Sequence, residues 1–313
     1  MTRKNGQDAA KRRQNTRKYS PSIAPVSPDV LPHHSTRFQT DLQPVKSTRF
    51  KKIPRGAKLL KEIKMIIAAH KAYPMPRTRM YLPLQVGSAL GEPLPYAQDN
   101  TGSNISEKNK TFCELTGLYW AWQNLEADYI GLCHYRRYFA RRPFGPKERR
   151  ILSDADADRV LQTNDVILPK KRNYWIETNY SQYVHAHHKE DLDTTRQIIS
   201  ERYPDYLPAY DKIMGRTSGH RFNMFIMKKD ILDGYCGWLF DVLFRLEERL
   251  DISQYDPVSR RVFGYVGERL LDVWIETNRI SYTELPVVNM ENQHWLKKGT
   301  RFLMRKLRGM REK

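Results

Sequence analysis

Residues 104–139 read NISEKNKTFCELTGLYWAWQNLEADYIGLCHYRRYF, and this stretch decides the fold. A loop rich in Gly, Ser and Asn (101–110) precedes apolar side chains that recur every three or four residues from Phe112 to Leu125. Such spacing predicts a helix with one apolar stripe. The next apolar run, 129–133, is typical of a buried strand because it is too short for a helix. The stretch therefore predicts a loop, a helix and a strand in succession.

A cationic cluster follows the predicted strand directly. His134 and Tyr135 lead into the adjacent Arg136 and Arg137. In open α/β sheets ligands bind beyond the carboxyl ends of the strands, and guanidinium groups bind oxyanions through paired hydrogen bonds. We therefore expect Arg136 and Arg137 to bind a phosphate. The alternative is that they are ordinary surface charges.

Several motifs within and around this stretch carry a family resemblance. They are NIS (104–106), KN (108–109), CELTG (113–117), YW (119–120), HYRRYF (134–139), AHK (69–71), DVILP (165–169), FNMFI (222–226), RVFG (261–264) and ERLL (268–271). Together they resemble a bacterial family found in capsular and exopolysaccharide loci, long labelled a domain of unknown function. The family is now regarded as glycosyltransferases, some of them galactofuranosyltransferases. The resemblance covers about 64–290 and implies a nucleotide-sugar-dependent transferase with a GT-A-like, Rossmann-related α/β fold.

The charge of the chain belongs to its ends. The net charge is +19 over 313 residues, yet 1–64 carries +12, 296–313 carries +7 and the rest is neutral. We expect a basic, disordered tail at 1–61, one transferase domain at 62–295 and a basic amphipathic tail at 296–313. A nucleic-acid-binding protein driven by the tails is an alternative, against which the neutral central region counts.

The cysteines and the hydropathy of the chain indicate the cellular compartment in which the protein works. Cys113, Cys133 and Cys236 are scattered and lack C-x-x-C spacing, so neither a disulfide framework nor a zinc site is predicted. No apolar run approaches the roughly 18 residues of a membrane span, and no signal-peptide pattern is present. We expect a cytoplasmic protein that associates peripherally with the anionic inner face of the membrane.

Residues expected to bind the donor lie after the first strand and in the polar loop. An apolar run at 62–69 predicts a strand, which ends at His70 and Lys71. The alternatives are a strand-end histidine satisfied by its neighbours and a loop that only caps the following helix. The expected donor-binding residues are His70, Lys71, Asp99, Asn104, Asn109, Arg136 and Arg137.

An Asp-x-Asp pattern at 154–158 is similar to the metal motif of GT-A enzymes. Acidic residues just before Arg159 also suit the first turn of a helix, where they cap free amides, and we prefer that interpretation. A second cluster, His185, His187, His188 and Asp191, has no evident third ligand and suits an acceptor-facing segment better than a metal site. We assign no metal ligand, although Mg²⁺ or Mn²⁺ could assist the reaction.

The remaining site residues lie in the second half of the chain. A turn before the predicted strand 221–227 holds His220 and Asn223, and a predicted helix at 262–273 carries Glu268. Glu268 could be a general base, or a solvated carboxylate paired with Arg261 or Arg269. The expected acceptor-binding residues are His185, His188, His220 and Asn223, and the expected catalytic residues are Glu268 and His134.

These assignments lead to one functional hypothesis and one rival enzyme. We expect a hexosyltransferase, inverting at the anomeric carbon, that moves a sugar such as galactofuranose from a nucleotide sugar to a lipid-linked glycan. A basic group must help the diphosphate leave, and His134, Arg136 and Arg137 are the candidates. A sugar-phosphate transferase that uses the same arginines is the alternative.

Overall fold

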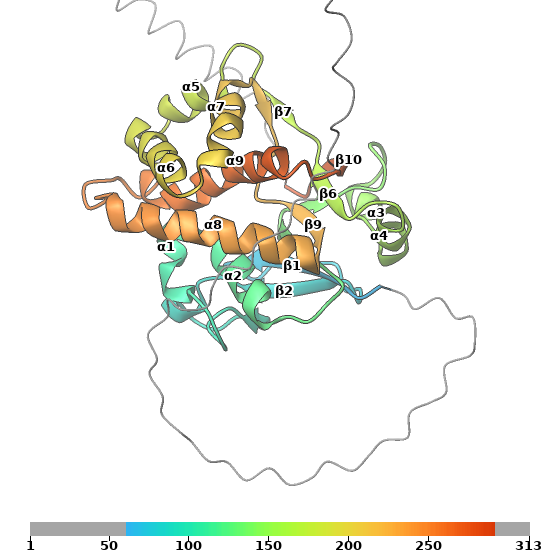
Figure 1. The fold of residues 1–313 in the computed structure, drawn as a ribbon. Helices are drawn as coiled ribbons and strands as arrows, with labels where there is room; N and C mark the ends of the chain where they lie inside the picture. The colour runs from blue at the N-terminus through green and yellow to red at the C-terminus, as the bar shows by residue number, and fades with distance from the viewer. Residues whose placement is uncertain (1–60, 292–313) are drawn as a thin grey trace, which may run out of the picture. The chain divides into compact units, whose positions relative to one another are not determined.

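The computed structural model describes residues 61–291. Apart from Lys61, the expected tails at 1–61 and 296–313 lie outside this range. The main sheet of the described residues has nine strands (Figure 1). Its linear part runs in the order β10 (Thr283–Leu285), β6 (Val166–Pro169), β9 (Phe225–Lys228), β4 (Tyr129–His134), β1 (Ile63–Ala69), β2 (Tyr81–Gln85), β3 (Ala97–Gln98). A ribbon of β5 (Arg137–Phe139) and β11 (Val287–Asn289) branches from the end of β4.

The central strands form because their sequences are apolar on both faces. β1 reads IKMIIAA and β4 reads YIGLCH, and both are almost entirely buried. They pair in parallel, as do β1 with β2 and β6 with β10, and parallel strands covered on both faces need such continuous apolar runs. The strands predicted at 62–69 and 129–133 are confirmed.

β9 departs from the predicted strand and from the parallel pattern. It is antiparallel to both β4 and β6. It begins at Phe225, later than the predicted 221, because Phe222 and Asn223 have φ of 77° and 50°. Left-handed backbone cannot continue a strand, so these residues form a turn that delivers side chains to the end of the sheet.

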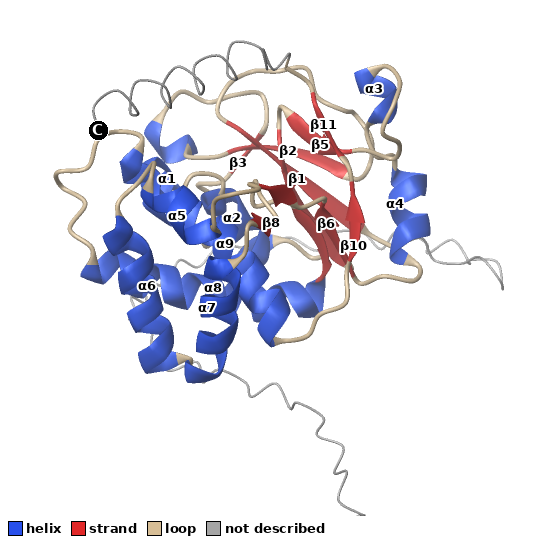
Figure 2. Cartoon of the chain, turned by 90° about the horizontal axis from the view of Figure 1, so that it is seen from above, coloured by secondary structure: helices blue, strands red, loops and turns tan. Residues whose placement is uncertain are grey.

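Helices cover both faces of the sheet (Figure 2). On one side lie the α1–α2 pair and the helices α5 to α9, and on the other lie α3 and α4. Their bounds are α1 (Asn109–Phe112), α2 (Leu115–Asn124), α3 (Lys147–Arg150), α4 (Asp154–Leu161), α5 (Asn179–Val184), α6 (Lys189–Arg202), α7 (Leu207–Gly215), α8 (Lys229–Arg249) and α9 (Val262–Thr277). The pair β7 (Arg172–Asn173) and β8 (Ser218–Gly219) forms a second small sheet beside them.

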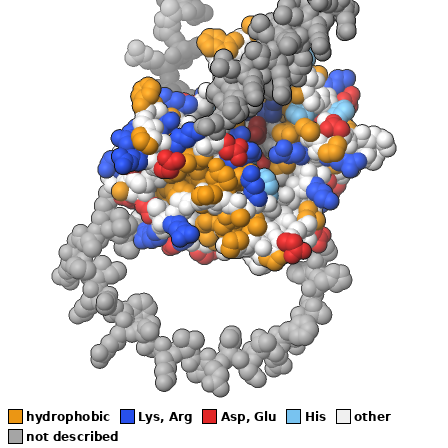
Figure 3. All heavy atoms as spheres, turned by 180° about the vertical axis from the view of Figure 1, so that it is seen from behind, with side chains coloured by type: hydrophobic (Ala, Val, Ile, Leu, Met, Phe, Trp, Pro, Cys, Tyr) orange, Lys and Arg blue, Asp and Glu red, His pale blue; other side chains and the backbone are white. Residues whose placement is uncertain are grey.

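Alternation along β1 divides the interior into two cores. Ile66 and Ala68 pack with α2, α8 and α9 in one core, whereas Met65 and Ile67 pack with α4 and the β5–β11 ribbon in the other. Successive side chains of a strand point to opposite faces, so one strand contributes to both. The face seen in Figure 3 carries hydrophobic side chains near its middle, with Lys and Arg side chains around them.

The helix predicted from Phe112 to Leu125 is broken at its start. Cys113 has φ 54°, so α1 ends before it and α2 begins at Leu115. A Cβ on Gly264 of α9 would lie 3.1 Å from the Cys113 side chain, so α9 approaches this break closely. The turn places Glu114, the residue before α2, toward the end of the sheet. No described helix is long and apolar enough to cross a membrane.

Candidate functional site

A cavity of about 850 Å³ lies at the carboxyl ends of β1 and β4. Its lining includes His70, which follows β1, and 134–137 at the end of β4. The α1–α2 break, the turn before β9, and α9 supply much of the remaining wall. Segments far apart in sequence therefore converge where an open α/β sheet binds its ligands.

The lining is strongly cationic. It contains eight Lys or Arg side chains and two carboxylates, Glu114 and Glu268. The cationic residues are Lys110, Arg136, Arg137, Arg172, Arg221, Arg260, Arg261 and Arg269. Such an excess of positive charge favours an anionic ligand, because guanidinium groups in a partly dry cavity attract oxyanions strongly.

Glu114 is a buried carboxylate held by two partners. Its Oε1 accepts a hydrogen bond from Asn223 Nδ2 at 2.7 Å and lies 3.5 Å from His134 Nε2. Asn223 Nδ2 also donates to the Gly264 carbonyl at 3.1 Å. Burial alone would raise the pKa of Glu114, but His134 and Asn223 favour the charged form and lower its pKa to about 2. Glu114 therefore stays ionised and fixes His134.

Glu268 is the second carboxylate of the lining, half-buried, and its environment shifts its pKa in the opposite direction. Its Oε1 accepts a hydrogen bond from the Phe222 amide at 3.2 Å. Burial raises the pKa of Glu268, and the nearby Arg269 opposes this only in part. His134 Nε2 lies 3.2 Å from the Phe222 carbonyl oxygen, so the left-handed turn links the two groups. A carboxyl with a raised pKa is suited to accept a proton during a reaction.

Arg136 and Arg137 present their guanidinium groups against aromatic rings. Arg136 lies 5.1 Å from the centre of the Tyr135 ring and pairs with Glu291 at 3.0 Å. Arg137 lies 4.5 Å from the centre of the Phe222 ring. The Nε of each arginine is buried and has no hydrogen-bond partner. A buried donor without a partner is costly, so both are prepared for a ligand that the cavity would receive.

A family model described as a domain of unknown function, DUF4422, matches residues 64–279. The chain belongs to the DUF4422 family. Its structure is similar to that of a solved protein titled as the bifunctional glycosyltransferase WbbM in its apo form, with a TM-score of 0.69 and 29% sequence identity. The match covers 74% of this chain and 46% of that one, so the DUF4422 chain spans less than half of that protein. No significant match is found among curated proteins. The expected GT-A-like α/β fold is confirmed.

Of the other expected donor residues, two line the cavity of the DUF4422 domain. The ring of His70 lies edge-on to the ring of Tyr135. The pKa of His70 is lowered, mainly by burial and to a lesser extent by the positive charge of Arg136. The Asn109 amide donates to the Cys113 carbonyl at 2.7 Å and to the Thr116 hydroxyl at 3.0 Å, which secures the α1–α2 break.

Three further expected donor residues lie outside the cavity lining. Lys71 faces the rings of Tyr73 and Tyr135. Asn104 only bridges its own loop, through Gly102 and Ser106. Asp99 is fully buried and organises the loop before α1. It accepts hydrogen bonds from the amides of Gly87 and Ser88 and from the hydroxyls of Ser88, Ser106 and Thr116.

The histidine cluster reaches the cavity through its middle member. His185 pairs with Glu177 at 2.8 Å, and His188 stacks on Tyr255 at 3.9 Å; neither lines the cavity. His187 does line it, stacked 4.3 Å from Tyr265, with a buried Nδ1 that has no partner. Burial and then Arg269 lower the pKa of His187 to about 4. His187 is therefore neutral at physiological pH.

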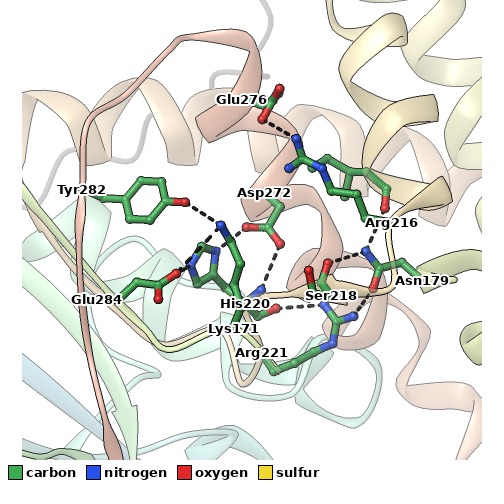
Figure 4. Close-up of polar contacts among 11 residues, drawn as sticks. Lys171, Asn179, Arg216, Ser218, His220, Arg221, Asp272, Glu276, Tyr282 and Glu284 are labelled. Atoms are coloured by element: carbon green, nitrogen blue, oxygen red, sulfur yellow. Dashed lines mark hydrogen bonds and ion pairs between the residues drawn. The ribbon is translucent and has the colours of Figure 1, made fainter. Parts of the chain in front are cut away.

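His220 and Asn223 lie behind the cavity wall and do not line it. His220 is completely buried between two carboxylates (Figure 4). The Asp272 carboxylate contacts its Nδ1 and accepts a hydrogen bond from its backbone amide at 2.9 Å. Glu284 Oε1 lies 3.0 Å from its Nε2. Asn223 contacts Glu114, as described above. The structure therefore gives both residues contacts that position neighbouring side chains.

Several residues that line the cavity were not predicted from the sequence. Glu114 lies inside the CELTG motif, and only the helix break just before it in the structure shows that it belongs to the site. Arg172, Arg221 and Arg269 come from three separate segments, and no spacing rule links them. Tyr174 reaches the lining from the turn after β7.

The residues present do not fit a divalent cation. The Asp154 carboxylate accepts a hydrogen bond from the Thr78 hydroxyl. The Asp156 amide donates to the hydroxyl of Ser153, the N-cap of α4, and the Asp156 carboxylate forms ion pairs with Arg141 and Arg159. Asp154 and Asp156 lie in the first turn of α4, as the preferred interpretation predicted, but the N-cap is Ser153 and not an acidic residue. Helix α4 lies on the face of the sheet away from α9. Within 61–291 no group of three or more His, Cys, Asp and Glu side chains could hold a metal. Of the cavity's two carboxylates, Glu114 contacts Asn223 and His134 and Glu268 accepts the Phe222 amide, and cationic side chains surround both.

Proposed function

We propose that this DUF4422 chain is a glycosyltransferase that moves a hexosyl group from a nucleotide sugar to a glycan acceptor. The observation that carries the proposal is the cavity at the carboxyl ends of β1 and β4, where arginines with buried, unpartnered Nε groups stand beside a carboxylate with a raised pKa. The likeness to a bifunctional glycosyltransferase supports it. Galactofuranose as the sugar, and capsule or exopolysaccharide as the product, are the finer parts of the proposal.

In this proposal the diphosphate of the donor lies on Arg136 and Arg137. Their free Nε groups donate to its oxygens, while the rings of Tyr135 and Phe222 hold the guanidinium planes. His134, fixed by Glu114, adds a further donor at the end of β4. As the bond from the anomeric carbon to the diphosphate oxygen breaks, negative charge accumulates on the leaving group, and these fixed cations stabilise it.

Glu268 is the general base of the proposed reaction. It accepts the proton of the acceptor hydroxyl while that oxygen forms the new bond to the anomeric carbon, which inverts the configuration. The neighbouring Arg221 and Arg269 lower the pKa of Glu268 against the effect of burial and so help to keep it ionised before the reaction.

Because the cavity offers cations in place of metal ligands, we propose that transfer needs no divalent cation. Turnover is then expected to persist after the protein is treated with EDTA. Measurement of product formation with EDTA and with added Mg²⁺ or Mn²⁺ tests this, and loss of turnover that either metal restores would contradict it.

The activity is tested by incubating the protein with a panel of nucleotide sugars and analysing the nucleotide released. A glycosyltransferase releases a nucleoside diphosphate, whereas a sugar-phosphate transferase releases a nucleoside monophosphate. Arg137→Gln is expected to lower the signal by roughly tenfold to a hundredfold, since one charge-assisted contact contributes on the order of 1.5–3 kcal/mol. The exposed Arg149→Gln on α3 serves as the control. Unchanged turnover and nucleotide affinity in Arg137→Gln would remove the phosphate assignment.

A further inference from the structure

The positive charge of the cavity exceeds what the proposed donor can use. Of its eight cationic side chains, Arg136 is paired with Glu291. Within the described part of the chain, the other seven have no carboxylate within 4.0 Å. Two of the seven, Arg221 and Arg269, are buried. A buried charge without a paired countercharge is unfavourable, so these two indicate an additional anion beside the diphosphate.

The surplus is concentrated around Tyr174, away from the arginines that follow β4. Arg221 donates from Nε to the Tyr174 hydroxyl at 2.7 Å, and its guanidinium lies 5.0 Å from the ring centre. Arg172 lies 5.3 Å from the centre of the same ring. Arg269 lies on α9. Burial is the main cause that lowers the pKa of Arg269, and the positive charge of the nearby Arg221 is the second. We refer to Arg172, Arg221 and Arg269 as the Tyr174 cluster.

The two buried arginines of the Tyr174 cluster are held by neutral groups alone. Arg221 is 5% exposed and donates to the His220 carbonyl at 2.9 Å and to Asn179 Oδ1 at 2.5 Å (Figure 4). Arg269 is 4% exposed and donates to the Tyr265 carbonyl and to Gln182 Oε1. Arg269 Nε is buried without a partner. Their hydrogen-bond partners are neutral. Glu268 acts electrostatically with both arginines, but one carboxylate cannot offset two guanidinium charges, so positive charge remains available to a ligand.

A polar network behind the cluster fixes the backbone that carries two of its arginines. Arg172 and Arg221 adjoin Lys171 and His220 in sequence, and both of those neighbours contact Glu284, at 3.8 Å and 3.0 Å (Figure 4). Arg172 is also in register with Gly219 across the β7–β8 pair. The backbones that carry the two arginines are therefore fixed relative to one another. A preorganised set of cations binds an anion with little ordering cost.

The position of the cluster assigns the second anion to the acceptor. Arg221 and Arg269 act electrostatically on Glu268, the group proposed to take the acceptor's proton. The donor diphosphate is assigned to Arg136 and Arg137, which follow a different strand. Next to Tyr174, Trp175 and Ile176 are 81% and 78% exposed, so an apolar surface adjoins the cationic one.

We propose that the Tyr174 cluster is a second oxyanion subsite, which binds an anionic group carried by the acceptor. The oxyanion is either the carboxylate of an acidic sugar or the diphosphate of a lipid carrier. This inference rests on the proposed glycosyl transfer and names the acceptor's chemical class. The subsite positions the acceptor hydroxyl beside Glu268 and takes part in no bond-making step.

The test compares three acceptors that share one sugar: a neutral glycoside, its uronic acid analogue, and the neutral glycan on a polyprenyl diphosphate. We expect kcat/KM for one charged acceptor to exceed that for the neutral one by roughly tenfold to a hundredfold. Arg172→Gln is expected to reduce this preference through KM, while the affinity for nucleoside diphosphate, measured by calorimetry, stays unchanged. Arg202→Gln, an exposed arginine at the end of α6, is the matched control.

The charged acceptor that is preferred identifies the source of the oxyanion. Equal kcat/KM for all three acceptors would overturn the subsite, as would an Arg172→Gln variant that loses nucleotide affinity and keeps acceptor preference. Direct binding separates the two proposals. If the protein saturated with nucleoside diphosphate binds a charged acceptor through Arg172 but transfers no sugar, the subsite stands and the glycosyl transfer fails. Arg269→Gln, checked for folding by thermal unfolding, provides a second variant.

Discussion

At the scale of single residues, the two carboxyls of the cavity have pKa values shifted in opposite directions. Glu114 has protein donors that favour its charged form, whereas Glu268 accepts one backbone amide and loses hydration in its half-buried position. The same side-chain chemistry thus gives a fixed anion at one position and a proton acceptor at the other. Different pKa values for paired carboxyls are a common sign of divided acid–base roles.

Glu268→Gln is expected to lower kcat by roughly a hundredfold to ten-thousandfold, because the amide cannot accept the acceptor's proton. Nucleoside diphosphate affinity should remain, since we propose that the diphosphate binds to Arg136 and Arg137. In the unaltered protein, kcat/KM should fall as the pH drops through the raised pKa of Glu268, where the base becomes protonated. The exposed Glu248→Gln on α8 is the control, and near-normal turnover in Glu268→Gln would return that residue to a structural role.

Glu114→Gln is expected to change how stability depends on pH. The folded-state pKa of Glu114 is about 2, against 4.5 for the free group, so its ionisation stabilises the fold above pH 4.5. This contribution, roughly 3 kcal/mol, is lost as the pH falls toward 2. Denaturant unfolding across this range should therefore show a shallower acid loss in Glu114→Gln than in the unaltered protein.

Glu268→Gln provides the comparison of opposite sign. Because the folded-state pKa of Glu268 is raised, its protonated form stabilises the fold and that contribution disappears as the pH rises through the raised value. Identical unfolding profiles for both variants and the unaltered protein would contradict the assigned directions of the two pKa values.

At the scale of elements, short irregular segments shape the site and regular ones support it. The break at Cys113 orients Glu114, the turn at Phe222 and Asn223 joins His134 to Glu268, and the turn after β7 presents Tyr174. Two of these segments hold non-glycine residues with positive φ, an unfavourable conformation that concentrates at functional sites. Trp175, next to Tyr174, is a third case, with φ 66°.

The turn after β7 can be tested with two substitutions at Trp175. Both Trp175→Ala and Trp175→Gly remove the exposed indole, and we expect both to raise KM for the acceptor. Glycine adopts φ near 66° freely and alanine does not. Trp175→Gly should therefore be more stable than Trp175→Ala, by about 1 kcal/mol, in thermal unfolding. If neither substitution changes KM, the indole lies outside the path of the acceptor.

Periodicity predicted the regular elements of this chain better than its site. Buried strands such as β1 and β4 are apolar runs, and α8 and α9 are long amphipathic patterns, so local sequence carries their signal. The start of β9 was predicted too early because a left-handed turn at Phe222 has no Gly to mark it. The Tyr174 cluster joins three distant segments, and only the packed fold brings such residues together.

At the scale of the whole molecule, most of the net positive charge and the candidate site lie in different parts of the chain. The segments beyond 61–291 hold most of the surplus positive charge, while the central region is neutral. The cavity is basic within that neutral region. We propose that the basic ends serve attraction to an anionic membrane surface, where a lipid-linked acceptor would be found.

Deletion of 296–313 tests this division. The segment carries +7, and each basic residue near an anionic surface contributes about 1 kcal/mol, screened by salt. We expect the shortened protein to transfer sugar to a soluble acceptor analogue as before and to lose salt-sensitive binding to anionic liposomes. Equal liposome binding by both proteins, and by a version that also lacks 1–60, would contradict a membrane role for either end.

The placement of β9 has a consequence for how the chain is made. Among the described strands, β9 alone joins β4 to β6, so the sheet consists of two parts bridged by four residues. On the ribosome, β1 to β4 are synthesised well before Phe225 and leave one long edge of β4 unpaired until β9 appears. Unpaired edges recruit foreign strands. While residues 134–225 are being synthesised, we therefore expect this edge to be open to pairing with other chains.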